Sequence, residues 1–153
     1  AMIKVNVAVG TKSWNKKITN TKEYFNKKLV KINKIINFFN KKNITFTIFL
    51  TNSINIKKIN KKFRKKNKAT DVLSFPFYLK KDLKDKKDKN IYIGDIAISY
   101  EIIKNRAKKG NFLLEFDKVW VHGLLHLIGY DHTKNKDYYI MSRIEKKILT
   151  SII

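Results

Sequence analysis

The sequence contains no cysteine, which excludes a disulfide framework and every zinc site built on thiolates. Any metal ion must therefore be bound by histidine, carboxylate or carbonyl ligands. A lack of cysteine also fits a protein of the reducing cytosol. At 153 residues, the chain is long enough to bury roughly 68–70% of the surface that its unfolded form exposes, so a core can form without cross-links.

Long hydrophobic runs are missing as well. No window reaches the roughly 18 uninterrupted apolar residues of a membrane span. The first ten residues, AMIKVNVAVG, alternate apolar and polar side chains, which predicts a strand and not the continuous apolar core of a signal peptide. We therefore expect a soluble, cytoplasmic protein that binds no membrane, and we interpret Ala1, which precedes Met2, as an expression remnant.

Acidic residues are few: 12 stand against 35 lysines and arginines, for a formal net charge of +23. Such a field attracts nucleic acid and other anionic partners. Only three of the basic residues are arginine, namely Arg64, Arg106 and Arg143. An excess of lysine, asparagine and isoleucine is also what an AT-biased coding sequence produces, so the charge alone leaves both interpretations open.

Hydrophobic periodicity predicts an α+β fold in a single domain over residues 1–153. Apolar alternation and β-branched residues predict four strands, at 2–9, 44–51, 68–78 and 91–99. Three- and four-residue spacing predicts about five helices, at 20–40, 53–63, 99–109, 111–129 and 135–151. We expect a small, mostly parallel four-stranded sheet packed with these helices.

Some residues predict local features of these elements. Ser53 is expected to cap the second helix. Pro76 indicates an edge position or the end of its strand, because proline donates no ladder hydrogen bond. Gly94 indicates a bulge or a close backbone approach within its strand. The segment 80–90, KKDLKDKKDKN, is expected to be a solvated loop or hairpin.

All three histidines of the chain lie in one stretch, VWVHGLLHLIGYDHT. His122 and His126 are four residues apart on a helix that is otherwise apolar, so both imidazoles are expected to enter its apolar surroundings and to reach one ion at about 2.0–2.1 Å. Gly129 can adopt the left-handed conformation that ends a helix, which allows His132 to return to the same ion. The pattern predicts a tri-histidine metal site at the C-terminal end of a buried helix, with a fourth position for water as in catalytic zinc sites.

The spacing H-x-x-x-H-x-x-G-x-x-H is that of the metzincin peptidases with one difference. Position 123 is glycine, where those enzymes carry the glutamate that acts as general base. We expect the missing side chain of Gly123 to leave room beside the metal for a bulkier substrate. A metzincin-like zinc peptidase is thus an alternative function that Gly123 opposes.

The segments HGLLHLIGYDH, NKKFRKKNKATDVLSFPF and IGDIAIS together resemble the YbeY family of bacterial metal-dependent endoribonucleases, which act in ribosomal RNA maturation. The resemblance runs from about Ile54 to the final helix, with a compatible strand and helix before it. It implies that His122, His126 and His132 are the metal ligands and that Arg64 is the arginine implicated in activity. Ala69 stands where the family often has proline, which is a mild change in a loop.

The resemblance also implies zinc, although three imidazoles would accept nickel or another first-row ion. It implies a single-strand-specific endoribonuclease that acts on small-subunit ribosomal RNA, including its 3′ end, and in ribosome quality control. We expect the small ribosomal subunit as a partner, no DNA and a monomer. A second alternative is a ribosome-assembly factor whose metal is mainly structural.

Arg64 also fits this chemistry on physical grounds, because a planar guanidinium can hold two oxygens of a phosphate whose negative charge is increasing. Other residues near these motifs have two interpretations each. Asp131 either orients an imidazole or completes the turn. The aromatic rings of Phe75, Phe77 and Tyr78 either pack in the core, which we favour, or stack on unpaired bases.

Overall fold

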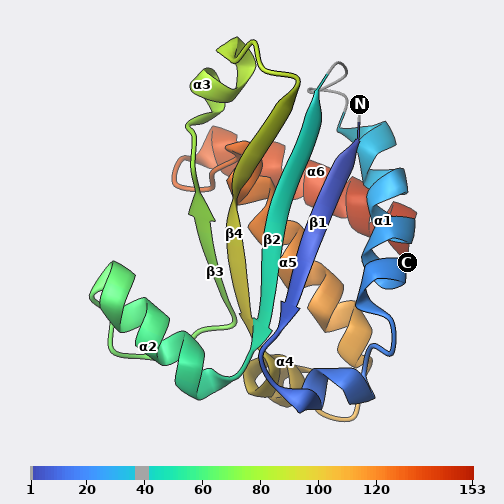
Figure 1. The fold of residues 1–153 in the computed structure, drawn as a ribbon, viewed down its shortest axis with the longest axis vertical. Coiled ribbons are helices and arrows are strands. Elements are labelled where there is room, and N and C mark those ends of the chain that lie inside the picture. Colours follow the sequence, from blue (N-terminus) through green and yellow to red (C-terminus); the bar gives the residue numbers. More distant parts are fainter. Residues whose placement is uncertain (1, 37–41) are drawn as a thin grey trace.

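Four strands form one sheet in the order β1-β2-β4-β3 (Figure 1). The computed structural model describes residues 2–36 and 42–153. Strands β1, β2 and β4 are parallel, and β3 runs antiparallel to β4 at the edge. The strands span Ile3–Val9 (β1), Asn43–Thr51 (β2), Val72–Pro76 (β3) and Asn90–Ser99 (β4). The predicted α+β class with a mostly parallel sheet is confirmed, and Pro76 ends an edge strand as predicted.

Within the described residues, six α-helices and one 3-10 helix connect and cover these strands. They are η1 (Lys12–Lys16), α1 (Thr21–Ile35), α2 (Ser53–Arg64), α3 (Lys80–Asp85), α4 (Tyr100–Ala107), α5 (Phe112–Ile128) and α6 (Asn135–Ile152). The helix predicted over 20–40 is confirmed as far as Ile35, and positions 37–40 lie outside the described residues. No helix in the described part of the chain is long and apolar enough to cross a membrane.

Two local predictions are wrong. Residues 80–85 of the predicted polar loop form helix α3, because its one apolar side chain, Leu83, is fully buried in the core and attaches the helix to it. Helix α2 is capped by Asn52 and not by Ser53: the Asn52 side chain accepts a hydrogen bond from the Asn55 amide at 2.8 Å. Asparagine and serine are equally good caps, so composition alone could not choose between neighbours.

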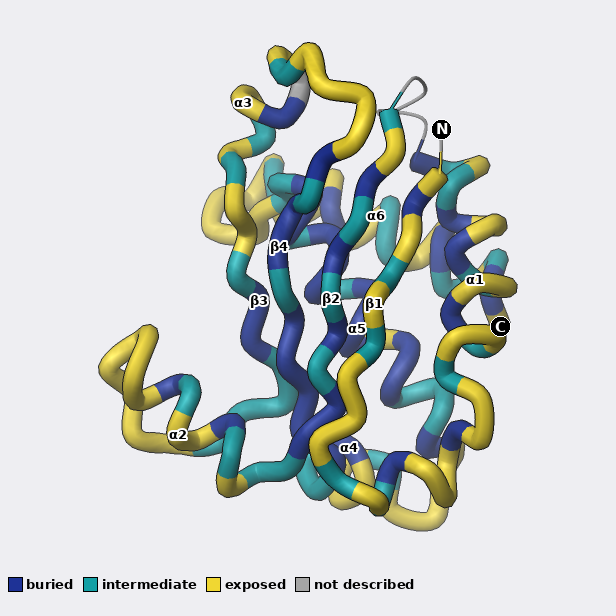
Figure 2. The backbone as a smooth tube through the Cα atoms, in the orientation of Figure 1, coloured by how far each residue is buried: buried dark blue, intermediate teal, exposed yellow. Residues whose placement is uncertain are grey.

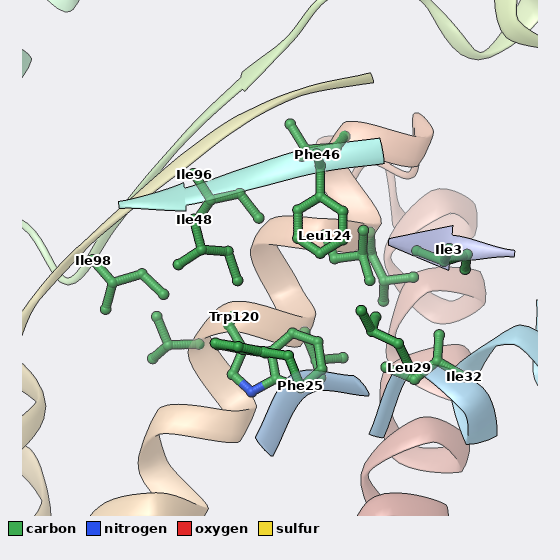
Figure 3. Packing of buried hydrophobic residues seen from close by; sticks show 14 of the residues in the cluster. Ile3, Phe25, Leu29, Ile32, Phe46, Ile48, Ile96, Ile98, Trp120 and Leu124 are labelled. Carbon is green, nitrogen blue, oxygen red and sulfur yellow. The ribbon is translucent and has the colours of Figure 1, made fainter. Parts of the chain in front are cut away.

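The core lies between one face of the sheet and helices α1, α5 and α6 (Figures 1 and 2). Helix α5 is apolar on nearly all sides and runs behind the strands, so its residues are buried along most of its length. Trp120 and Leu124 of α5 meet Phe25 of α1 and the inward residues Phe46 and Ile48 of β2 (Figure 3). This packing fixes the position of α5 against the sheet, and with it the positions of the histidines.

Gly94 lies at a bulge in β4, as predicted. The pairing of β2 with β4 shifts register between Thr45 and Phe46, and Gly94 has φ of 144°. A Cβ atom at this position would lie 2.3 Å from the carbonyl oxygen of Phe75 in the neighbouring strand β3. Only glycine permits this backbone conformation together with such a close approach.

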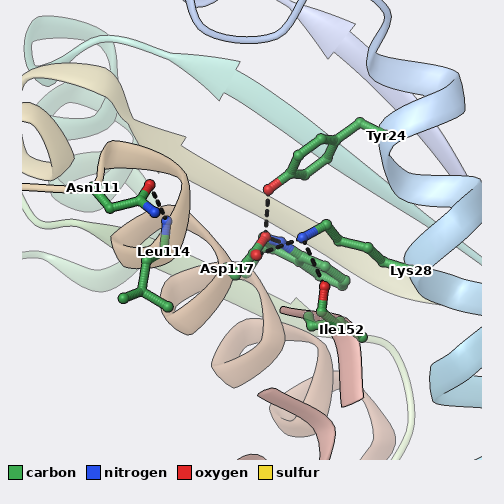
Figure 4. A network of polar contacts seen from close by, with 7 residues as sticks. Tyr24, Lys28, Asn111, Leu114, Asp117 and Ile152 are labelled. Atoms are coloured by element: carbon green, nitrogen blue, oxygen red, sulfur yellow. Dashed lines mark hydrogen bonds and ion pairs between the residues drawn. The ribbon is translucent and has the colours of Figure 1, made fainter. Parts of the chain in front are cut away.

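A buried carboxylate connects α5 to two other helices. Asp117, which is 2% exposed, accepts hydrogen bonds from the Tyr24 hydroxyl at 2.6 Å and from the Trp120 ring nitrogen at 2.8 Å, and pairs with Lys28 at 2.7 Å. The Lys28 ammonium also donates to the carbonyl of Ile152 in α6 (Figure 4). Burial and the charge of Asp117 raise the pKa of Tyr24 far above its usual value, so the hydroxyl stays a donor.

Candidate metal centre

The local structure of the histidine segment is as the spacing predicts. The side chain of Asn111 caps the first turn of α5 by accepting from the Leu114 amide at 3.2 Å. Gly129 ends the helix with φ of 107°, and the amides of Gly129 and Tyr130 both bond to the carbonyl of Leu125. This left-handed termination turns the chain back over the end of the helix and brings His132 close to the two helical histidines.

The three imidazoles converge on one point. Their ligand-capable atoms all lie within 4.8 Å of one another, and the Nε2 atoms of His122 and His126 are 3.0 Å apart. The ring of His132 lies 5.0 Å from that of His126 and 5.5 Å from that of His122, between centroids. In a tetrahedral site with bonds of about 2.0–2.1 Å, ligand nitrogens are about 3.3 Å apart, so the arrangement fits one metal ion.

The outer nitrogens of two rings support this assignment. The Nδ1 atom of His122 lies 3.0 Å from the Glu145 carboxylate, and that of His126 lies 3.0 Å from the Tyr130 carbonyl oxygen. Each Nδ1 faces an acceptor and so carries the proton, which leaves two Nε2 lone pairs directed at each other. Two lone pairs at this distance repel, and a shared cation removes the repulsion.

Sequence reasoning missed Glu145. Its side chain is 25% exposed and lies on the inner stripe of α6, between the buried residues Met141 and Ile148. A carboxylate in an otherwise apolar stripe, in a chain with only 12 acidic residues, is the signal that could have identified it. Its partner could not be read from the sequence, because the contact depends on how α6 packs against α5.

Replacing Glu145 with glutamine should weaken metal binding by about 10–100-fold while leaving the fold intact, because the carboxylate holds the His122 ring and raises its basicity. Competition with a coloured chelator measures this directly. Glu115→Gln is the matched control, since Glu115 lies on α5 and pairs only with exposed Lys118 among the described contacts. Equal metal affinity in both variants would show that Glu145 does not position the ligand.

The histidines do not lie in an apolar interior, which corrects the prediction. His122 and His126 are half-buried and His132 is exposed, because the C-terminal end of α5 opens into a cleft of about 450 Å³. One wall of the cleft is the inner face of β3, through Ser74 and Pro76. Burial, and next the charges of the neighbouring imidazoles, lower the pKa of His126, which favours the neutral form that a metal requires.

Gly123 has a different role from the one we expected. A Cβ atom at this position would lie 3.1 Å from Ser74 Oγ and 3.2 Å from Ile96, so it faces the sheet and the space is filled by protein. The Ser74 hydroxyl instead donates to the Gly123 carbonyl at 3.2 Å. Glycine at 123 therefore allows α5 to pack closely on the sheet. The carboxylate that a metzincin peptidase places here is still absent.

Arg64, far from the histidines in sequence, lines the same cleft. It lies at the C-terminal end of α2, where its guanidinium donates to the Ser74 carbonyl at 2.5 Å and lies 5.4 Å from the centre of the Phe75 ring. These two contacts hold a flexible side chain at the mouth of the cleft. The cleft thus combines three imidazoles with a fixed guanidinium.

Asp131 completes the turn and does not bond to an imidazole ring. Its carboxylate accepts from the His132 amide at 2.7 Å and from the Thr133 hydroxyl at 3.1 Å. The hydrogen bond from the His132 amide is the main reason that the pKa of Asp131 is lowered. By fixing the backbone at residue 132, Asp131 helps to position the Cα atom from which the third imidazole side chain extends.

The chain is similar to known proteins over nearly its whole length. The family described as Endoribonuclease YbeY matches residues 8–153. A protein of Pelagibacter ubique named Endoribonuclease YbeY is 47% identical over 151 residues, covering 96% of this chain and 94% of that protein. A protein of the same name from Ehrlichia canis is 37% identical, covering 99% of this chain and 93% of its own.

A solved structure is similar as well. A solution structure of a Thermotoga maritima protein superposes with a TM-score of 0.63 at 25% identity, covering 99% of this chain and 89% of that one. The similar fold and the family match over nearly the whole chain both indicate membership of one family. This chain therefore belongs to the endoribonuclease YbeY family.

Proposed function

We propose that this protein, acting as one domain over residues 1–153, is a metal-dependent endoribonuclease that cuts single-stranded ribosomal RNA. Its setting would be the cytoplasm, where it matures the 3′ end of the small-subunit RNA and takes part in ribosome quality control. The observation that carries the proposal is one cleft lined by three convergent histidines and Arg64. The names of its relatives support RNA as the substrate.

His122, His126 and His132 would hold the ion, which we propose to be zinc, since a neutral three-imidazole set suits it. When bound, such an ion acts as a Lewis acid toward a phosphoryl oxygen or water. Glu145 and the Tyr130 carbonyl keep two of the rings in the required tautomer. Both contacts are already formed in the absence of substrate, so the site needs little reorganisation during the reaction.

Arg64 would bind the phosphate. One N–H group is used by the Ser74 carbonyl, and a guanidinium has five, so its fork can still donate to two phosphate oxygens. Negative charge that develops on those oxygens is stabilised most by a donor that is already fixed. Lys80 adds positive charge to the lining of the same cleft, where its ammonium lies 4.3 Å from the centre of the Tyr130 ring.

The cleft volume, about 450 Å³, is that of a small-ligand site and suits an unpaired nucleotide rather than a duplex. A peptidase is disfavoured because position 123 carries no carboxylate and faces the sheet. Hydrolysis of a peptide bond would therefore require a general base other than the side chain at position 123.

The test is a cleavage assay with four main reactions, together with addition of zinc after chelation and a parallel reaction on double-stranded RNA. Purified protein is incubated with labelled single-stranded RNA or with an unfolded protein, each with and without a chelator. We expect RNA cleavage that the chelator abolishes and added zinc restores, with the unfolded protein intact and double-stranded RNA cut far more slowly. Chelator-sensitive cleavage of the unfolded protein, with RNA intact, would overturn the proposal in favour of a peptidase. No cleavage of either substrate by metal-loaded protein would favour an assembly factor.

A further inference from the structure

The face of the sheet opposite α1, α5 and α6 carries exposed aromatic rings. In Figure 1 this face is turned to the viewer, and no helix crosses in front of β1, β2 and β4. Phe63 is 62% exposed and Phe77 is 55% exposed, so the expectation that Phe77 packs in the core is wrong. A groove of about 550 Å³ runs over this face, lined by Phe49, Phe63 and Phe75.

Four of the rings form two pairs, which we call the aromatic face. Phe63 of α2 and Phe75 of β3 are 5.8 Å apart between centroids, at 67°. Phe77, just after β3, and Tyr92 of β4 are 5.2 Å apart, at 54°. Alternate residues of an extended strand share a face and rise about 3.3 Å each, so the backbone positions of Phe75 and Phe77 are about 7 Å apart and the two pairs are neighbours along the sheet edge.

Strand β3 is the wall between this face and the metal cleft. Ser74 and Pro76 line the cleft, whereas the alternate residue Phe75 lines the groove on the other side. Arg64 joins the two, since it lines the cleft while its guanidinium lies over the Phe75 ring. A chain held by Arg64 that leaves the cleft over this short edge strand meets the aromatic face next.

The charge around the aromatic face suits a polyanion. From Ser53 to Thr70 the sequence has seven lysines and no acidic residue, and the lysines of this segment are exposed. Among the described residues that line the groove, Asp95 is the one with a carboxylate, and it accepts a hydrogen bond from the Tyr92 hydroxyl. A partner that combines phosphates with flat apolar rings matches both properties, and unpaired RNA is such a partner.

We propose that the aromatic face binds the bases of the RNA strand that flank the scissile phosphate. This inference rests on the proposed function and adds to it a binding site for the unpaired strand. It gives a physical reason for a preference for single strands, because bases in a duplex are stacked on each other and cannot lie on protein rings. Stacking on aromatic side chains also tolerates any base sequence, because every base presents a flat face.

The test compares binding of labelled RNA by the full-length protein in chelator, where nothing is cut. The double variant Phe63→Ala, Phe77→Ala removes the two most exposed rings of the aromatic face, and Val30→Ala on α1, with 56% exposure, is the matched control. For a twelve-nucleotide single strand we expect affinity to fall at least about tenfold in the double variant, and to stay within about twofold in the control. An abasic strand with the same number of phosphates should bind the wild-type protein and the double variant with equal affinity.

Cleavage separates this inference from the function it rests on. In metal-loaded protein the double variant should raise KM for the twelve-nucleotide RNA with kcat nearly unchanged, and Phe63→Trp, Phe77→Trp should restore KM. Unchanged affinity in a folded alanine double variant, while wild type still cuts RNA, would overturn the aromatic face as an RNA site and favour a protein partner there. A wild-type protein that cuts no RNA would instead overturn the proposed function.

Discussion

Replacing His126 with alanine is expected to leave the protein without bound metal and without RNA cleavage. His126 is the central residue of the three proposed ligands: its Nε2 is 3.0 Å from that of His122, and its ring is the nearer of the two helical rings to His132. Two remaining imidazoles on an open cleft chelate weakly. A metal ion supplies several kcal/mol of charge stabilisation, so the cleavage rate should fall about a thousandfold or more. Elemental analysis and initial rates measure both effects.

Lys118→Ala is the matched control, because Lys118 is an exposed residue one turn before His122 on the same helix, and its ammonium pairs with the Glu115 carboxylate at 3.3 Å. It should keep about one equivalent of zinc and full activity. Thermal unfolding gives a second readout: chelator should lower Tm in wild type and in the control, since metal binds only the folded site, and should not change Tm in His126→Ala. Full metal occupancy in His126→Ala would refute the assignment of the ligands.

The metal centre was predictable where it depends on neighbours in sequence. Four-residue spacing brings His122 and His126 to one face of a helix, and a left-handed glycine at 129 returns the chain regardless of what surrounds it. The exposure of these rings was not predictable, because an apolar helix reads as buried along its whole length. Only the placement of β3 shows that the end of α5 opens into a cleft.

Contacts between distant elements account for the other errors. The sequence does not indicate whether residue 123 faces the metal or the sheet. The structure shows that it faces the sheet, because Ser74 and Ile96 on two strands lie against it. Helix α3 was not predicted, because the burial of one leucine, Leu83, stabilises it among charged residues only once the core is formed. Glu145 was missed for the same reason, since its role exists only when α6 lies on α5. Pairwise packing, not propensity, decided each case.

Replacing Arg64 with alanine should lower RNA cleavage by about a hundredfold to a thousandfold, the usual effect of removing one fixed donor to a developing oxyanion. Metal content and Tm should stay close to wild type, because Arg64 is exposed and does not contact the histidines. Initial rates at saturating and low RNA concentrations separate phosphate binding from stabilisation of the transition state. A loss confined to KM would make Arg64 a binding residue, and a loss in kcat a catalytic one.

Two further variants separate geometry from charge at this position. Arg64→Lys keeps the positive charge but loses the planar fork, its bond to the Ser74 carbonyl and its stacking on Phe75, so it should recover little of the lost activity. Lys61→Ala removes an exposed charge one turn earlier on α2 and should change the rate by less than about twofold, since exposed charges are well screened. If Arg64→Ala and Lys61→Ala behaved alike, Arg64 would contribute only to the general positive field, and the fixed guanidinium would have no special part in cleavage.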